Sequence, residues 1–175
     1  MTKRFLKQPV KICPYNKEWK LQFEKEKGLL IESIDKEVLV AHIGSTAVTN
    51  MPAKPIIDIM IGFNSKKDIL SEIPNIEKSG YIYDKNFEKI IPERKFFYKF
   101  NEKEVISHQI HSTIYKNKFW NDRIAFRDIL EVHKDVAKKY LDLKMKLEKK
   151  YKYKRTEYSE GKSDFIAKVL KRYKG

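Results

Sequence analysis

Residues 42–62 read HIGSTAVTNMPAKPIIDIMIG, and this stretch carries the clearest signal of the fold. An apolar strand over 38–43 ends at Gly44, where a turn can open a short helix. After a loop with two prolines, residues 56–61 form a second expected strand, apolar on both faces apart from Asp58. Because such strands belong in the middle of a covered sheet, we expect helices on both faces of that sheet.

The same stretch combines residues that suit a bound phosphate. Gly44 lets the backbone approach a ligand closely, and free N–H groups at the start of a following helix favour an anion. The Ser45 hydroxyl adds a further hydrogen-bond donor. Asp58 needs a metal, a cation or a donor, because it stands on an apolar strand. These features predict a triphosphate–Mg²⁺ pocket, with the alternative of an ordinary turn and a structural Asp58–Lys54 ion pair.

Outward from this stretch, strands and helices alternate and then give way to helices alone. Helical spacing of apolar residues predicts helices over 17–35, 65–79, 117–131, 134–151 and 157–173. Further strands are expected over 10–12 (or an extended arm there), 81–83, 94–100 and 104–113, the last two as a hairpin, with a polar loop over 84–93.

This order predicts an α/β (α+β) fold, in which a mixed β-sheet is flanked by helices and followed by a C-terminal helical layer. The 175 residues fit one domain spanning 1–175. Its sheet core is expected at about 10–113 and its helical part at about 117–173.

Several separate motifs resemble one protein family in the right order along the chain. Residues 42–48 and 53–59 are similar to the signature of the GrpB-like family. Further similarities are Pro-Tyr at 14–15 before Trp19, the basic pair 94–95 before two aromatics, Phe-Arg-Asp at 126–128, and Tyr-x-Glu-x-Lys-x-x-Phe-Ile at 158–166. The resemblance covers about 10–170 and implies the polymerase-beta-like fold of the nucleotidyltransferase superfamily, to which that family is assigned.

The resemblance implies a fold more directly than an activity, because one expected feature is missing. Active nucleotidyltransferases place an Asp-x-Asp pair and a third carboxylate beside the Gly-Ser turn, where they hold two metal ions. Here Ile56 and Met60 stand two residues on either side of Asp58, and neither side chain binds Mg²⁺. The expected cofactor is therefore a single Mg²⁺ held by Asp58 and by substrate phosphates.

A histidine on another strand is the expected partner of Asp58. Residues 107–112 read SHQIHS, and strand alternation puts Gln109 and His111 on one face. The resembled family carries His-x-His here, and Gln109 takes the place of the first histidine. Facing Asp58, His111 is expected to act as a metal ligand, a phosphate donor or a general acid or base, with a purely structural, hydrogen-bonded histidine as the alternative.

The candidate site combines these residues with nearby cations. The expected catalytic residues are Ser45, Asp58 and His111, of which Asp58 and His111 are also the expected metal ligands. Cations expected around the pocket include Arg123, and the expected substrate-binding residues are Gly44, Thr46, Lys54, Arg94, Lys95, Gln109, Arg127 and Lys162. Arg127 has an alternative role as a surface ion pair on its helix.

The composition limits the cellular compartments and the binding partners that we expect for this protein. The net charge is +14, and residues 134–175 hold fifteen Lys or Arg against six Asp or Glu. One cysteine excludes an intrachain disulfide framework, and no stretch is apolar enough to cross a membrane. The basic start at residues 1–7 lacks the apolar core of a signal peptide, so we expect a cytoplasmic protein.

Three functions follow from these features. The first is a nucleotidyltransferase-like protein that binds a nucleotide or other phosphorylated small molecule, with Mg²⁺-dependent nucleotidyl or phosphoryl transfer. The second is a non-catalytic accessory module that has lost the second carboxylate, as fusion of resembled proteins to dephospho-coenzyme A kinase domains suggests. The third is weak RNA binding through the basic C-terminal helices, although specific nucleic-acid binding is not expected.

Overall fold

A five-stranded mixed sheet forms the centre of the molecule, in a computed structural model that describes residues 8–174. The strands are β1 (Leu39–Ile43), β2 (Ile57–Phe63), β3 (Ile82–Tyr83), β4 (Arg94–Phe100) and β5 (Ile106–Ile114), in the spatial order β1-β2-β5-β4-β3. Neighbouring β2 and β5 run parallel, and the other pairs are antiparallel. This confirms that the strand carrying Asp58 lies inside the sheet, between β1 and β5.

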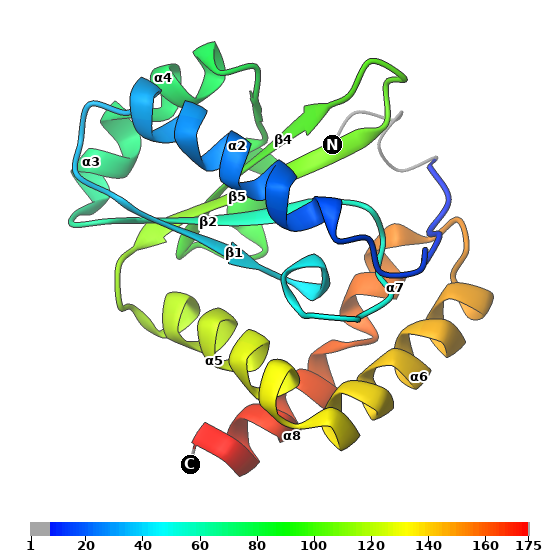
Figure 1. Cartoon of the computed structure of the whole chain (residues 1–175). Helices are drawn as coiled ribbons and strands as arrows, with labels where there is room; N and C mark the ends of the chain where they lie inside the picture. Colours follow the sequence, from blue (N-terminus) through cyan, green and yellow to red (C-terminus); the bar gives the residue numbers. More distant parts are fainter. Residues whose placement is uncertain (1–7, 175) are drawn as a thin grey trace.

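Helices cover both faces of this sheet. The helices are α2 (Glu18–Ser33), α3 (Lys66–Ser71), α4 (Ile73–Lys78), α5 (Lys118–Val132), α6 (Lys134–Lys150), α7 (Arg155–Glu160) and α8 (Ser163–Lys174), with 3₁₀ turns η1 (Ser45–Ala47) and η2 (Lys85–Lys89). Figure 1 shows α2, α3 and α4 on one side of the sheet and α5, α6 and α8 on the other. The predicted α/β architecture with a C-terminal helical layer is therefore confirmed.

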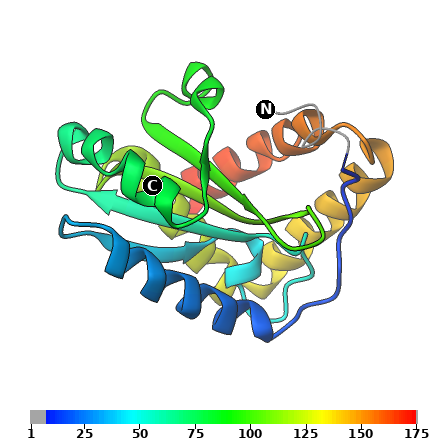
Figure 2. The ribbon, with the colours of Figure 1, turned by 90° about the horizontal axis from the view of Figure 1, so that it is seen from above.

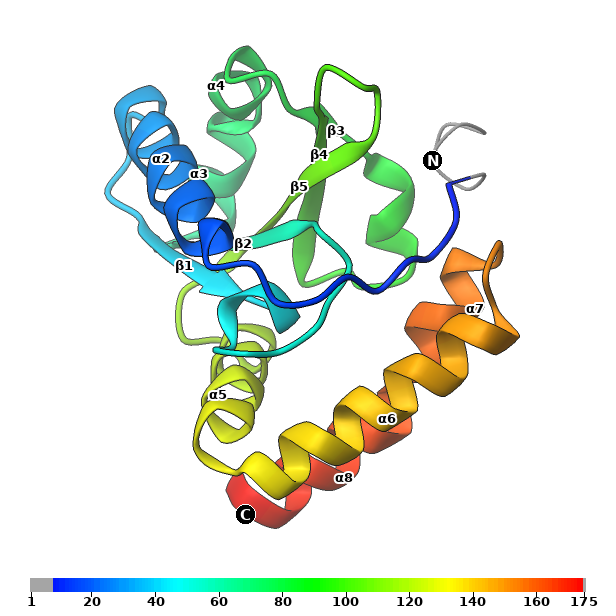
Figure 3. The same ribbon diagram turned by 45° about the vertical axis from the view of Figure 1, so that its right-hand side comes forward.

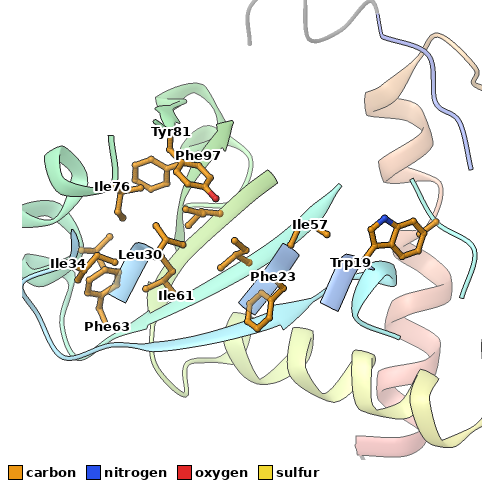
Figure 4. Close-up of a cluster of buried hydrophobic side chains, with 14 residues drawn as sticks. Trp19, Phe23, Leu30, Ile34, Ile57, Ile61, Phe63, Ile76, Tyr81 and Phe97 are labelled. Atoms are coloured by element: carbon orange, nitrogen blue, oxygen red, sulfur yellow. The ribbon is translucent and has the colours of Figure 1, made fainter. Parts of the chain in front are cut away.

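The main apolar core lies between the sheet and α2. Ile57, Ile59 and Ile61 alternate along β2 and face this core, together with Phe97 and Ile110 from the neighbouring strands. Phe23 and Leu30 of α2 pack onto them, as Figure 4 shows for the labelled side chains. Because β2 is apolar on its opposite face as well, it is covered from both sides, as expected of a central strand.

The C-terminal helices form a separate layer. Helix α8 returns alongside α6, so that the end of the chain comes back to α5 (Figures 1 and 3). Phe126, Tyr140 and Val169 form the core of this layer together with Val48 and Met51, which come from the loop after β1. The loop that follows the Gly-Ser turn therefore connects the helical layer to the sheet.

The N-terminal segment reaches this helical layer as an arm. The Val10 amide donates to Lys152 O at 2.7 Å, and Cys13 forms an isolated bridge with Ala53. Figure 2 shows this dark blue segment passing the C-terminal helices. Residues 10–12 form no strand, so of the two predictions for them the extended arm is the one observed. The predicted absence of a signal peptide concerned residues 1–7, which lie outside the described part.

Three predicted boundaries were wrong for local reasons. The helix expected over 65–79 is divided at Glu72, because Pro74 in the first turn of α4 has no N–H for a continuing helix. The helix expected over 157–173 begins at Arg155 and is divided at Gly161, because glycine has a low helix propensity. The loop expected over 84–93 contains the 3₁₀ turn η2. No helix in the described part of the chain has the length and apolarity needed to cross a bilayer.

Thr46 fixes the turn after β1. Its Oγ1 donates to Ile56 O at 3.2 Å and therefore accepts from His42 Nε2 at 3.0 Å. Burial lowers the pKa of His42 to about 4, so its ring is neutral, and it stacks on Phe23 with ring centroids 4.6 Å apart. Only 1% of Thr46 is exposed, so water cannot replace these bonds.

Replacing Thr46 by valine is expected to lower the free energy of unfolding by about 1–3 kcal/mol, because the buried Ile56 carbonyl loses its donor and His42 its acceptor. Urea unfolding followed by circular dichroism measures this change. Thr49→Val is the control, because the Thr49 hydroxyl accepts only an exposed bond from Lys20. Equal small effects of both substitutions would contradict the role given to Thr46.

Candidate functional site

A cavity of about 1130 Å³ lies between the sheet and the C-terminal helices. Its lining comes from the turn after β1, from β2, β4 and β5, from the η2 region, and from all four helices α5–α8. Ten of the lining residues are Lys or Arg and three are Asp or Glu, so the cavity is strongly positive. Such a lining attracts a ligand with several negative charges.

The Gly-Ser turn and Asp58 form one wall of this cavity. Gly44 has a φ of 72° and lies so close to β2 that an added Cβ would be 2.4 Å from Asp58 Oδ2. Ser45 follows directly, and both residues line the cavity. Turn η1 has only three residues, which is too short for a helix dipole of any size, so the expected anion binding at a helix start has little support.

Strand pairing brings His111 to Asp58. In the parallel β2–β5 pair, Asp58 lies opposite Gln109 and Met60 opposite His111. His111 Nε2 is 3.8 Å from Asp58 Oδ1, which is too long for a hydrogen bond and would be an ion pair only with a protonated imidazole. Of the Asp58 side chain 28% is exposed, toward the cavity. Burial raises the pKa of Asp58, but His111, Lys54 and Lys162 outweigh it, so the pKa lies below its ordinary value.

Arg94 holds the other side of His111. Arg94 Nη1 donates to His111 Nδ1, and because a guanidinium only donates, Nδ1 must be the acceptor. Burial, and then the charge of Arg94, lower the pKa of His111 to about 4 against the opposing effect of Asp58. At neutral pH the ring is therefore uncharged and carries its hydrogen on Nε2, on the side of Asp58.

The Arg94 side chain is enclosed by aromatic rings. Only 8% of Arg94 is exposed, and its Cζ lies 4.9 Å from the centre of the Phe96 ring and 5.9 Å from that of Phe119. Arg123 contacts the same Phe119 ring at 5.1 Å. Within residues 8–174, Arg94 Nε is buried with no hydrogen-bond partner. Burial, and then the charge of Arg123, lower the pKa of Arg94 to about 10.

A second group of cations meets at Tyr158 of α7, with Lys54 coming from the loop before β2 and Lys162 from the turn between α7 and α8. Lys54 Nζ and Lys162 Nζ lie 5.0 and 4.6 Å from the centre of the Tyr158 ring. Burial, and then the charge of Lys162, lower the pKa of Lys54 well below its ordinary value. Burial also lowers the pKa of Lys162 to about 8. In the described chain neither lysine forms an ion pair with Asp58 within 4 Å, so the alternative of a structural Asp58–Lys54 pair is not observed.

The sequence did not single out Lys144 and Arg155, which also line the cavity. Lys144 is 2% exposed and donates to Pro52 O at 2.6 Å, and burial followed by the charge of Lys162 lowers its pKa to about 7. Arg155 is 6% exposed, and burial lowers its pKa too. A signal for Lys144 was present, because it stands four residues after Tyr140 on the apolar stripe of α6.

Most of the predicted site residues line this cavity. They are Gly44, Ser45, Thr46, Lys54, Asp58, Arg94, Gln109, His111, Arg123, Arg127 and Lys162. Arg127 also donates to His42 O at 2.9 Å and pairs with Asp128 at 2.7 Å, so part of its role is to fix β1 on α5.

Lys95 does not line the cavity. It pairs with Glu88, because it alternates along β4 with Arg94 and Phe96, which do face the cavity.

The predicted metal pair fits Mg²⁺ poorly. Magnesium prefers six oxygen ligands in octahedral geometry, and Asp58 supplies the one carboxylate of this wall, while Ile56 and Met60 are buried in the core. To bind a metal through Nε2, His111 would need its hydrogen on Nδ1, where it would face the N–H groups of Arg94. Residues 8–174 contain no group of three His, Cys, Asp or Glu side chains that could hold a metal. The predicted ligand set of Asp58 and His111 is therefore not supported.

Sequence comparison places the chain beside known proteins over nearly its whole length. The model of the GrpB family, described as "GrpB protein", matches residues 9–172. The glutamate-rich protein GrpB of Alkalihalophilus pseudofirmus is 33% identical over 94% of this chain and 95% of its own length. The UPF0157 protein YqkA of Bacillus subtilis is 32% identical over 91% of this chain and 46% of its own length.

Solved structures agree with this match. The conserved protein GrpB from Enterococcus faecalis superposes with a TM-score of 0.80 at 29% identity, covering 93% of this chain and 96% of that one. Cid1, in complex with its short product ApU, superposes with a TM-score of 0.51 at 11% identity, covering 76% of this chain and 42% of that one. The second likeness is one of fold alone, and that fold is nucleotidyltransferase-like.

Gly44→Ala is expected to lower the free energy of unfolding by more than about 2 kcal/mol, because the backbone conformation suits glycine and the new methyl meets Asp58. Chemical unfolding measures the loss. Gly28→Ala is the control, since nothing lies within 4 Å of its added Cβ in α2, and a stabilisation of about 0.5–1 kcal/mol is expected. Full stability of the Gly44→Ala protein would disprove the close approach.

Stability is expected to rise as the pH increases from about 7 toward 10.5, partly through Lys144. The unfolded chain keeps this lysine protonated up to its ordinary pKa of 10.5, whereas the folded chain releases the proton from about 7. Lys144→Met should flatten this rise in unfolding free energy, measured by urea titration at a series of pH values. The exposed Lys149→Met should leave the slope unchanged, and equal slopes for all three proteins would contradict the assignment.

Proposed function

Since this chain belongs to the GrpB family and has a nucleotidyltransferase-like fold, both as predicted from its sequence, we propose that its cavity binds a nucleotide or another phosphorylated small molecule. The observation that carries this proposal is the excess of ten Lys or Arg over three Asp or Glu in the lining of one cavity. Phosphate groups are anions that form strong, charge-assisted hydrogen bonds with Lys and Arg side chains.

Part of the C-terminal charge lines the cavity, and its two buried members favour a cavity ligand over RNA. Five basic residues of the last 42 line the cavity, namely Lys144, Arg155, Lys162, Lys171 and Lys174. Lys144 and Arg155 are too deeply buried to contact a nucleic-acid backbone on the surface. The charges of Lys144 and Arg155 are therefore directed inward, toward a ligand that fits a cavity of about 1130 Å³.

Asp58 is the residue that a transfer reaction would use as a general base. Its carboxylate is ionised at neutral pH and open to the cavity. It would accept the proton of an acceptor hydroxyl while the oxygen of that hydroxyl bonds to phosphorus and the bond to the leaving phosphate oxygen breaks. Lys54 and Lys162 would neutralise the charge left on the departing group, and Ser45 would donate to a phosphate oxygen.

A non-catalytic accessory module is the second candidate, and one observation favours it. Ile56 and Met60 occupy the positions beside Asp58 where a second carboxylate would stand, and they are 6% and 0% exposed. A site built for ligand binding without transfer needs the cations but no second carboxylate. Both candidates require ligand binding, but only the first requires a transfer reaction. A measurement of product formation therefore distinguishes them.

Calorimetric titration of the full chain with ATP, CTP, GTP and UTP, with and without Mg²⁺, tests the proposal. At least one nucleotide should bind, and the Lys54→Gln/Lys162→Gln double variant should bind it at least about tenfold more weakly, because two contacts to phosphate are lost. The matched control is Lys149→Gln/Lys150→Gln, which removes the same charge from exposed positions on α6.

Two outcomes count against this proposal: no binding of any nucleotide, or equal weakening in both double variants, since the second would mean general charge attraction. Incubation of a bound nucleotide with an acceptor alcohol, analysed by mass spectrometry, then separates the candidates. A transferred product that disappears in Asp58→Asn supports the transfer reaction. Binding without product supports the accessory module.

A further inference from the structure

The bond between Arg94 and His111 decides what the imidazole can offer a ligand. With Nδ1 accepting from Arg94, the neutral ring presents an N–H group at Nε2, 3.8 Å from Asp58 Oδ1. The lone pair that a metal ion would need is therefore not available on this side. An N–H group can donate to a phosphate oxygen or to the Asp58 carboxylate.

Asp58 alone is a weak anchor for a divalent cation. One of its oxygens is covered by Gly44, whose added Cβ would lie 2.4 Å from Oδ2. Lys54 and Lys162 are close enough to lower the pKa of this carboxylate, so positive charge already balances it. A divalent ion here would be repelled by those same lysines.

Two pairs of cations line the cavity around Asp58. Lys54 and Lys162 share the ring of Tyr158 on α7, and Arg94 and Arg123 share the ring of Phe119 on α5. Asp58 acts on the charges of both Arg94 and Lys162, so it lies within electrostatic range of each pair.

None of these four cations has a carboxylate partner within 4 Å in residues 8–174. In addition, Arg94 Nε is buried without a partner in that range. Positive charges that have no carboxylate partner within 4 Å, one of them the buried Arg94, leave room for anionic groups of a ligand.

We infer that the cavity binds the phosphate groups of its ligand directly through Lys54, Lys162, Arg94 and Arg123, with no divalent cation held by the protein. This depends on the proposed function and adds the class of ligand: a molecule with at least two phosphate groups, which reach the two cation pairs on either side of Asp58. The lysines and arginines thus replace the metal that the Asp-x-Asp pair would hold.

Titration of the wild-type chain with inorganic triphosphate and with ATP, in excess EDTA and in excess MgCl₂, tests this inference. Direct binding predicts a Kd in EDTA that equals or is lower than the Kd in MgCl₂, because Mg²⁺ neutralises part of the charge of the ligand. Inorganic monophosphate, which reaches only one pair, should bind at least about tenfold more weakly than triphosphate.

The Asp58→Asn substitution provides a test in which the two mechanisms predict opposite changes in the affinity for triphosphate. If the cations bind phosphate directly, removing the carboxylate removes a repulsion, and triphosphate in EDTA should bind about threefold to tenfold more tightly. If Asp58 holds a metal ion, binding in MgCl₂ should be weakened instead. Asp135→Asn is the control, because it changes the net charge equally at an exposed site of α6. Circular dichroism confirms that each variant is folded.

The outcomes separate this inference from the proposal on which it rests. If triphosphate and nucleotides fail to bind in either buffer, both are overturned. Binding that requires Mg²⁺, or that weakens in Asp58→Asn, overturns direct binding by the cations but leaves nucleotide binding intact. Equal affinity for monophosphate and triphosphate overturns the two-pair class of ligand.

Discussion

The central constraint on this molecule is an ionised carboxylate in the middle of an apolar sheet. Asp58 stands on β2 between β1 and β5, and the residues two positions away on either side are buried and apolar. Such a charge is stable only where other groups compensate it. The close turn at Gly44, the imidazole of His111 and the side chains of Lys54 and Lys162 all meet this requirement at one point. The cavity exists where these groups converge.

The C-terminal helical layer supplies part of that compensation, through Lys162. Lysines and arginines ordinarily lie on the outer face of such helices, yet Lys144, Arg155 and Lys162 line the cavity between the helices and the sheet. Lys144 lies over the ring of Tyr140 and donates to Pro52 O, and Lys162 lies over the ring of Tyr158. These contacts offset part of the free-energy cost of burying the two charges. An excess of positive charge remains, and a phosphorylated ligand would satisfy it.

Much of this arrangement could be predicted because it follows short repeating patterns. The apolar run from 56 to 61 indicated a covered strand, and the two-residue period of a strand put Gln109 and His111 on one face. The same period explains the error at Lys95, which is next to Arg94 in sequence and therefore points away from the cavity. Adjacent strand residues cannot both line one wall.

What could not be predicted depends on contacts between distant segments. The helical period puts Lys144 on the buried stripe of α6, but only the carbonyl of Pro52, brought from the loop before β2, shows what partner its ammonium group has there. Likewise, the sequence alone does not distinguish a strand histidine that binds a metal ion from one that donates a hydrogen bond to a phosphate. Only the guanidinium of Arg94, placed by the pairing of β4 with β5, decides which nitrogen of His111 carries the hydrogen.

The N-terminal arm also has a consequence for how the cavity forms during synthesis. Val10 packs against Leu147 and Tyr158, and its amide donates to Lys152 O, so segments nearly 150 residues apart meet beside α6 and α7, two of the helices that line the cavity. Residues as far as about 158 must therefore leave the ribosome before these contacts can form. The sheet can assemble earlier, which means that a nascent chain passes through a stage with an ordered scaffold and no enclosed pocket.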